Sequence, residues 1–115
     1  MLVSVIAAVS SLATTPFLDY VNLPDASFSW KPSPSVGDIK IIDIVSQTWH
    51  GNSWRHAIAL IEPTSLKHRG MSVLIITGGI VNKADLDIGK SVADGSGMTV
   101  AILFGIPNQP LFGRW

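Results

Sequence analysis

Two short apolar runs with a helical stretch between them constrain the fold of this chain most strongly. Residues 72–77 (SVLIIT) and 98–104 (MTVAILF) are continuous in aliphatic and β-branched side chains. This pattern is typical of strands that are buried on both faces of a parallel sheet. Residues 84–94 carry apolar side chains at helical spacing, and Gly95 follows them as a stop signal. A strand, a helix and a second strand in this order predict a parallel β-α-β unit with a right-handed crossover.

An antiparallel hairpin is predicted ahead of this unit. Residues 38–49 are dense in Ile and Val, and residues 54–62 alternate loosely between apolar and polar side chains. A Gly-Asn-Ser turn at 51–53 separates the two runs, and a short turn of this composition joins antiparallel strands. The predicted fold class is therefore α/β, with an antiparallel hairpin followed by the β-α-β unit.

The stretch before the hairpin, residues 14–37, contains four prolines. Proline lacks an amide donor and restrains the residue before it, so we expect an irregular, extended N-terminal arm. The arm is not expected to be a flexible linker, because it carries aromatic side chains that need burial. These are Phe17, Tyr20, Phe28 and Trp30.

Residues 1–13 (MLVSVIAAVSSLA) form an apolar run that is shorter than the ~20 residues of a membrane span. Ser11 and Ala13 supply the small-x-small pattern of a signal-peptidase site, and polar residues follow. We therefore predict a secretion signal over 1–13 and a secreted or periplasmic location, with a buried N-terminal strand or helix as the alternative. We predict no transmembrane segment elsewhere.

Composition excludes several classes of protein. Of the 115 residues 47% are apolar and 14% are charged, which excludes an intrinsically disordered chain. Eight Lys and Arg balance eight Asp and Glu, so we expect no broad basic surface and no nucleic-acid partner. The absence of cysteine excludes disulfide scaffolds and thiol catalysis. We expect no metal and no cofactor, since the histidines lack the spacing of zinc ligands; they are His50, His56 and His68.

One motif-like segment fails on its context. Gly89-Lys90-Ser91 resembles the end of a phosphate-binding loop, but Ala84 stands where that loop needs a glycine. Ser91 also half-matches a nucleophile elbow, which requires a strand immediately before the serine. The segment lies in the predicted helix, so we predict neither a phosphate loop nor a nucleophile at Ser91.

Two further features are candidates for ligand binding. The glycine turn at 77–79 follows a predicted buried strand, and in hydrolases such a turn donates an oxyanion-hole amide. Trp49 and Trp54 flank the hairpin turn, where they could form a platform for a sugar or a peptide. Glycines also end strands and aromatic rings also pack in cores, so each feature has a purely structural alternative.

Short motifs along the chain match one family in the right order. The most specific are Ser46-Gln47-Thr48-Trp49 and Pro107-Asn108-Gln109-Pro110. Weaker matches lie at 18–22, 24–25, 29–30 and 77–79. Together, from about residue 16 to residue 112, the chain resembles the PhoPQ-activated pathogenicity-related proteins.

The resemblance implies a secreted or periplasmic protein with an α/β-hydrolase-like fold. In such a fold the hairpin supplies the first two strands and the β-α-β unit the third and fourth, in the spatial order 1-2-4-3. The backbone of Gly79 or Ile80 would then contribute an amide to the oxyanion hole. Ile80 and Val81 stand where the glycine run of the family would continue.

The nucleophile elbow, the acid and the histidine of a hydrolase would all follow the fourth strand of that fold. We therefore expect an N-terminal part of an α/β-hydrolase-like domain over 38–115, without hydrolase activity of its own. The strand at 73–76 would lack a neighbour, and an unpaired apolar edge predicts self-association. The alternative is a small secreted binding or host-interaction module that uses Trp49 and Trp54.

Overall fold

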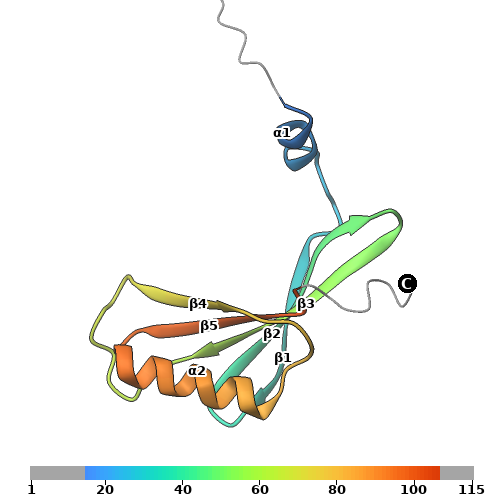
Figure 1. The fold of residues 1–115 in the computed structure, drawn as a ribbon. Helices are drawn as coiled ribbons and strands as arrows, with labels where there is room; N and C mark the ends of the chain where they lie inside the picture. The colour runs from blue at the N-terminus through green and yellow to red at the C-terminus, as the bar shows by residue number, and fades with distance from the viewer. Residues whose placement is uncertain (1–14, 107–115) are drawn as a thin grey trace, which may run out of the picture.

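The computed structural model describes residues 15–106. Its elements are α1 (Pro16–Val21), β1 (Ser29–Val36), β2 (Ile39–Trp49), β3 (Asn52–Ile61), β4 (Ser72–Ile76), α2 (Lys83–Ser96) and β5 (Thr99–Phe104). The strands form one sheet in the order β1-β2-β3-β5-β4, with α2 packed on it (Figure 1). β4 and β5 are parallel, and every other neighbouring pair is antiparallel.

The predicted hairpin and the predicted β-α-β unit are both confirmed. β2 and β3 form the hairpin, and α2 connects the parallel strands β4 and β5. The order 1-2-4-3 expected for these four strands corresponds to β2-β3-β5-β4 and is also confirmed. The protein is therefore a mixed α/β structure.

Local signals account for both ends of α2. The side chain of Asn82 caps the N-terminus by accepting a hydrogen bond from the amide of Asp85 at 3.0 Å. At the other end Gly97 adopts the left-handed conformation and its amide bonds the carbonyl of Ala93. The helix is slightly longer than predicted because it runs to the residue before this glycine, past Gly95.

The core lies between α2 and one face of the sheet. Leu86 and Ala93 of α2 are buried against side chains of the three central strands. On the sheet side the buried residues are Ile39, Ile41, Ala59, Ile61, Val100, Ile102 and Phe104. Gly89 is also buried at this contact, and a Cβ there would come within 2.6 Å of the side chains of Ile61 and Ile102. The missing side chain therefore lets the helix approach the sheet closely.

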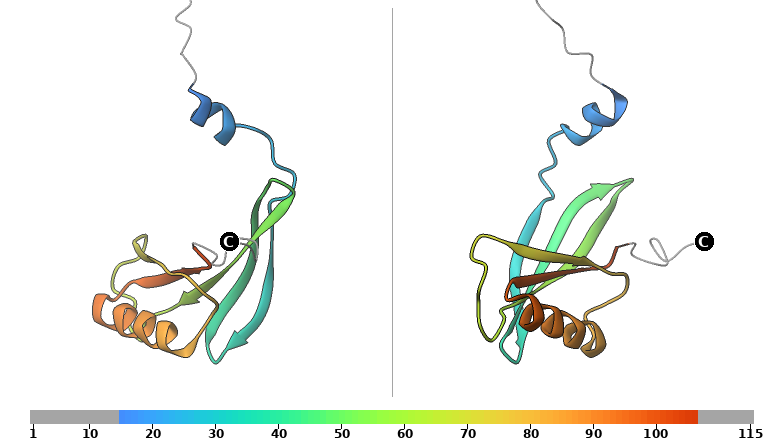
Figure 2. Two further views of the ribbon diagram at one scale, coloured as in Figure 1. Left: turned by 45° about the vertical axis from the view of Figure 1, so that its right-hand side comes forward. Right: turned by 60° about the vertical axis from the view of Figure 1, so that its left-hand side comes forward.

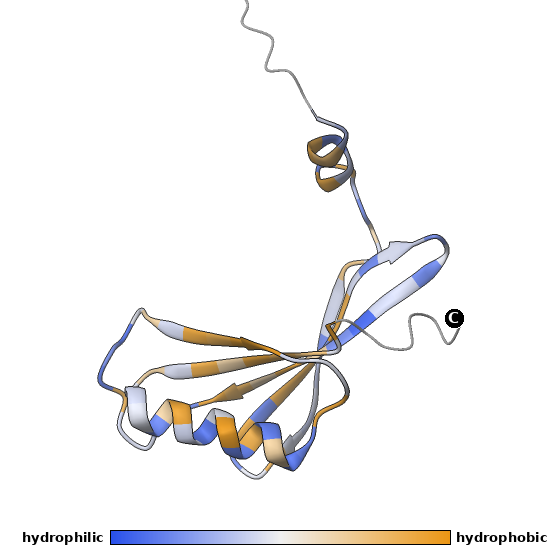
Figure 3. Ribbon diagram, viewed as in Figure 1, coloured by the Kyte–Doolittle hydropathy of each residue, from blue (hydrophilic) through white to orange (hydrophobic). Residues whose placement is uncertain are grey.

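The prediction that the two parallel strands are buried on both faces is wrong. No described element covers the face opposite α2, as both views in Figure 2 show. Leu74 and Ile76 on β4 are therefore 58% and 57% exposed. The other large apolar residues of this face are Ile42, Ile44, Ile58, Leu60 and Leu103. Figure 3 shows how apolar residues recur along the strands of the sheet.

The prediction of an irregular arm is also wrong for most of its residues. Pro16 begins the short helix α1, and β1 pairs antiparallel with β2 as an edge strand. An edge strand needs only one row of ladder bonds, so it tolerates Pro32 and Pro34. The expected burial of the arm's aromatic side chains is not found, since Trp30 is 63% exposed.

Candidate functional site

The carboxyl edge of the parallel strands carries a cleft of about 380 Å³. β4 leaves this edge through the glycine turn at 77–79, and β5 leaves it through Gly105. Ligands of open α/β sheets bind at this edge, outside the carboxyl ends of the strands. The cleft is lined by Arg55, His56, Ala57, Gly79, Ile80, Val81, Phe104 and Gly105.

The strand exits at this edge are held together by their own backbone. The amide of Thr77 donates to the carbonyl of Leu103 at 2.9 Å, and the amide of Ile106 donates to the carbonyl of Thr77 at 3.1 Å. The hydroxyl of Thr77 is also 3.5 Å from a carboxylate oxygen of Asp85 at the start of α2. The turn after β4 is thus fixed between the exit of β5 and the first turn of the helix.

The two residues predicted to supply an oxyanion-hole amide, Gly79 and Ile80, both line this cleft. Ile80 is 84% exposed. The structure thus places the predicted residues at the carboxyl edge of the parallel strands. Their role in stabilising an oxyanion stays a prediction.

A serine–histidine pair that the sequence did not predict stands beside this cleft. The hydroxyl of Ser46 on β2 is 2.9 Å from Nε2 of His56 on β3, and Nδ1 of His56 is 3.2 Å from the carbonyl oxygen of Gly105. A carbonyl oxygen only accepts, so Nδ1 carries the proton. In the neutral ring Nε2 then accepts from the Ser46 hydroxyl. The three groups form a directed chain across β2, β3 and the end of β5.

The pairing of β2 with β3 brings the serine to the histidine, because His56 lies opposite Ile44 and Ser46 follows Ile44 by two residues on the same face. The register of the hairpin shifts between Val45 and Gln47, which leaves Ser46 as the extra residue of β2. An unshifted ladder would pair Ser46 with Trp54, which lies on the same face as His56, and the bulge gives this place to Gln47. The local signal was the pair of polar residues on neighbouring predicted strands, but the predicted hairpin carried no register that would set them side by side.

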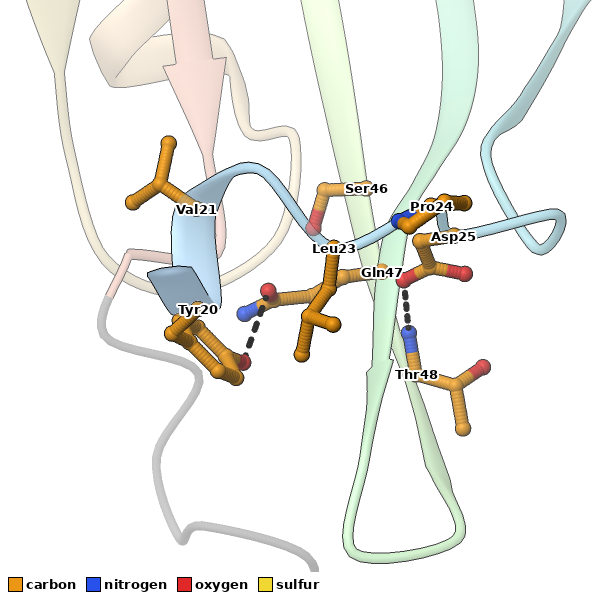
Figure 4. A pocket seen from close by; sticks show the side chains of 8 residues that line it. All are labelled: Tyr20, Val21, Leu23, Pro24, Asp25, Ser46, Gln47 and Thr48. Atoms are coloured by element: carbon orange, nitrogen blue, oxygen red, sulfur yellow. Dashed lines mark hydrogen bonds between the residues drawn. The ribbon is translucent and has the colours of Figure 1, made fainter. Parts of the chain in front are cut away.

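A second cleft, of about 450 Å³, lies where the N-terminal arm meets β2 (Figure 4). The Tyr20 hydroxyl donates to Oε1 of Gln47 at 3.2 Å, and Oδ2 of Asp25 accepts from the amide of Thr48 at 3.0 Å. The side chain and amide of Ser27 and the amide of Thr48 all donate to Asp25, and they lower the pKa of its carboxyl group below the ordinary 3.8. The carboxylate is therefore ionised at neutral pH.

Each residue of the predicted motif at 46–49 makes a different contact. Ser46 bonds His56, and Gln47 and Thr48 hold the arm as described above. Trp49 meets Trp54 edge to face, with ring centroids 6.3 Å apart and planes at 73°. Two rings at this angle do not form one flat surface of the kind predicted as a binding platform. The second predicted motif, Pro107-Asn108-Gln109-Pro110, lies outside the described residues.

The remaining sequence candidates are not brought together. Ser91 is an exposed residue of α2, as expected from the rejection of the elbow motif. Within residues 15–106 no group of three or more histidines, cysteines or acidic residues could hold a metal ion. In the same part of the chain no helix combines the length and the apolar character needed to cross a membrane.

The fold and the edge cleft define a mixed α/β protein with a cleft at the carboxyl edge of its parallel strands, and comparison with known sequences gives its family. The model of the PhoPQ-activated pathogenicity-related proteins matches residues 17–114, and the chain belongs to that family. The predicted resemblance is thus confirmed.

The chain is also similar to autocrine proliferation repressor protein A of Dictyostelium discoideum. The two sequences are 25% identical over 125 aligned positions, which cover 96% of this chain and 25% of the relative. The chain thus spans about a quarter of the length of that relative. No solved structure matches the chain significantly.

Proposed function

We propose that this chain forms the opening part of an α/β-hydrolase-like domain and supplies one wall of its ligand site. The carrying observation is the free edge of β4, which in residues 15–106 pairs only with β5 although its side chains are almost all apolar. The strand order β2-β3-β5-β4 and the helix that joins β4 to β5 support the same assignment. Further strands would pair with β4 and further helices would cover the exposed sheet face.

The chain's contribution to chemistry in such a domain is the turn after β4. Backbone amides of Gly79 or Ile80 would donate to a negatively charged oxygen that develops on the substrate, at about 2.7–3.1 Å. The nucleophile elbow, the acid and the histidine of a hydrolase triad would come from outside this chain. By itself the chain is then a binding wall and does not catalyse hydrolysis by that triad.

The same free edge supports self-association of the isolated chain. Unpaired backbone groups beside Leu74 and Ile76 offer a template for a second copy. The proposed location is secreted or periplasmic, and its support is the signal-like run at 1–13.

Sedimentation of the full chain at several concentrations tests the proposal. We expect oligomers or precipitation, and we expect Leu74→Lys together with Ile76→Lys to shift the chain toward monomer by placing charges along the edge and its exposed face. The matched control is Ile80→Lys, another exposed apolar residue, which lies beyond the end of β4. A monomeric chain that unfolds cooperatively without any of these changes would contradict the proposal.

A further inference from the structure

Ser46, the first residue of the motif at 46–49, takes part in two features to which the resemblance assigns no role. Its hydroxyl bonds Nε2 of His56 at 2.9 Å, and the residue also lines the cleft of about 450 Å³ between the arm and β2. Nucleophile–base pairs in enzymes have this separation, and their base is oriented by a third group. Here the carbonyl of Gly105 orients the imidazole from the other side.

We propose that Ser46 is a nucleophile that takes up an acyl group from a neutral ester, with His56 as its general base. The site uses residues of β2 and β3 and requires neither Gly79 nor Ile80. It is therefore independent of the hydrolase-like role proposed above. β4 lies at the other edge of the sheet, so self-association through that strand leaves the cleft beside Ser46 open.

The transfer balances without a further reactant. Oγ of Ser46 attacks the carbonyl carbon of the ester while its proton passes to Nε2 of His56. The bond between that carbon and the leaving oxygen then breaks, and the leaving alkoxide takes the proton from Nε2. The products are an alcohol, an ester of Ser46 and a neutral imidazole.

The lining of the cleft determines the class of acyl donor. Val21, Leu23 and Pro24 contribute apolar surface from the arm, and Asp25 contributes the one charge. The ionised carboxylate of Asp25 repels an anionic donor, whereas the apolar residues favour a short hydrocarbon chain. Neutral esters with small aliphatic acyl groups satisfy both conditions.

One side chain is placed to stabilise the negative charge of the intermediate. The Tyr20 hydroxyl donates a hydrogen bond to Oε1 of Gln47. The side-chain amide nitrogen of Gln47 therefore remains as a donor at the wall of the cleft (Figure 4). A single side-chain donor stabilises less than a pair of fixed backbone amides. Formation of the Ser46 adduct is therefore the quantity to measure, rather than turnover.

The experiment treats the full chain with p-nitrophenyl butyrate and with a biotinylated fluorophosphonate. The modified residue is identified by peptide mass spectrometry, and folding is checked by circular dichroism. We expect one butyryl or phosphonyl group on Ser46, none in Ser46→Ala, and a rate lowered on the order of a hundredfold in His56→Gln. Ser53→Ala removes another serine of the same hairpin and should react like the unchanged chain.

Modification of Ser46→Ala at the same rate as the unchanged chain would overturn the proposal, as would a folded chain that reacts with neither probe. If Ser46→Ala does not fold, Ser46→Cys retains a side chain of similar size. Its thiol should react with iodoacetamide at least about tenfold faster than that of Ser53→Cys, because His56 takes the thiol proton. Equal rates for the two cysteine variants would contradict activation by His56.

Discussion

Gly89 of α2 lies directly against Ile102 of β5, and a Cβ on the glycine would come within 2.6 Å of the Ile102 Cδ1 atom. Gly89 has a low helix propensity and so weakens α2, but its lack of a side chain is what lets α2 pack closely on the sheet. The same contact shows why the Gly-Lys-Ser segment is not a phosphate loop: its glycine is buried in the core.

Gly89→Ala should destabilise the protein by about 1 kcal/mol. Overpacking a core lowers the free energy of unfolding by about 1–3 kcal/mol, and the higher helix propensity of alanine offsets up to about 1 kcal/mol of that loss. Gly95→Ala is the matched control, because it lies in the same helix with nothing within 4 Å of an added Cβ. That change should stabilise by about 0.5 kcal/mol. Urea unfolding measures both, and equal effects would contradict the close contact.

Asp94→Asn should destabilise the protein at neutral pH and have little effect in acid. Oδ1 of Asp94 accepts a hydrogen bond from the backbone amide of Thr64 at 2.7 Å, and this hydrogen bond lowers the pKa of the Asp94 carboxyl group below 3.8. A lowered pKa in the folded state adds stability above the ordinary value, and that stability is lost as the pH falls through the folded value.

Urea unfolding of both proteins at pH 7 and well below pH 3.8 tests the role of Asp94. The difference in unfolding free energy should shrink in acid. Asp87→Asn is the control, because Asp87 pairs only with the exposed Lys83. A difference for Asp94→Asn that is the same at both pH values would mean that its charge does not contribute.

Asp25→Ala should release the N-terminal arm from the hairpin. Asp25 joins the amide of Thr48 to Ser27 of the arm, so its removal exposes the Thr48 amide to solvent. Hydrogen exchange followed by nuclear magnetic resonance should show faster exchange at Thr48 and unchanged exchange at Ile102 in the core. Asp38→Ala, which changes an exposed acid next to β2, should leave the Thr48 amide protected.

The elements predicted correctly are those determined by local sequence. The apolar runs of β4 and β5 are each contained in a few consecutive residues, so their signals do not depend on distant partners. β1 was missed for the opposite reason. Pro32 and Pro34 forbid a central strand, and only the pairing with β2 shows that they lie at an edge.

The residues of the candidate sites also divide into those that local sequence predicts and those that depend on strand pairing. Gly79 and Ile80 could be placed at the carboxyl edge because they directly follow a recognisable strand. The contact between Ser46 and His56 depends on the register of the hairpin, which sets Ile44 opposite His56 and so puts Ser46 beside the histidine on the same face. The predicted hairpin had no assigned register, so its pattern did not show which residue lies opposite His56.

Gly97→Ala should be more damaging than Gly89→Ala, with a loss of more than about 2 kcal/mol. The left-handed backbone at Gly97, with φ of 68°, costs an alanine about 1–2 kcal/mol. The added Cβ would also lie 2.8 Å from the Cβ of Lys67, whose amide donates to the Gly97 carbonyl at the same distance. Gly70→Ala isolates the backbone effect, because Gly70 has φ of 84° with nothing within 4 Å of an added Cβ. Urea unfolding should therefore show a larger loss for Gly97→Ala than for Gly70→Ala, and the difference measures the clash with Lys67. Equal losses would mean that the loop before β4 moves aside freely and does not fix the end of α2.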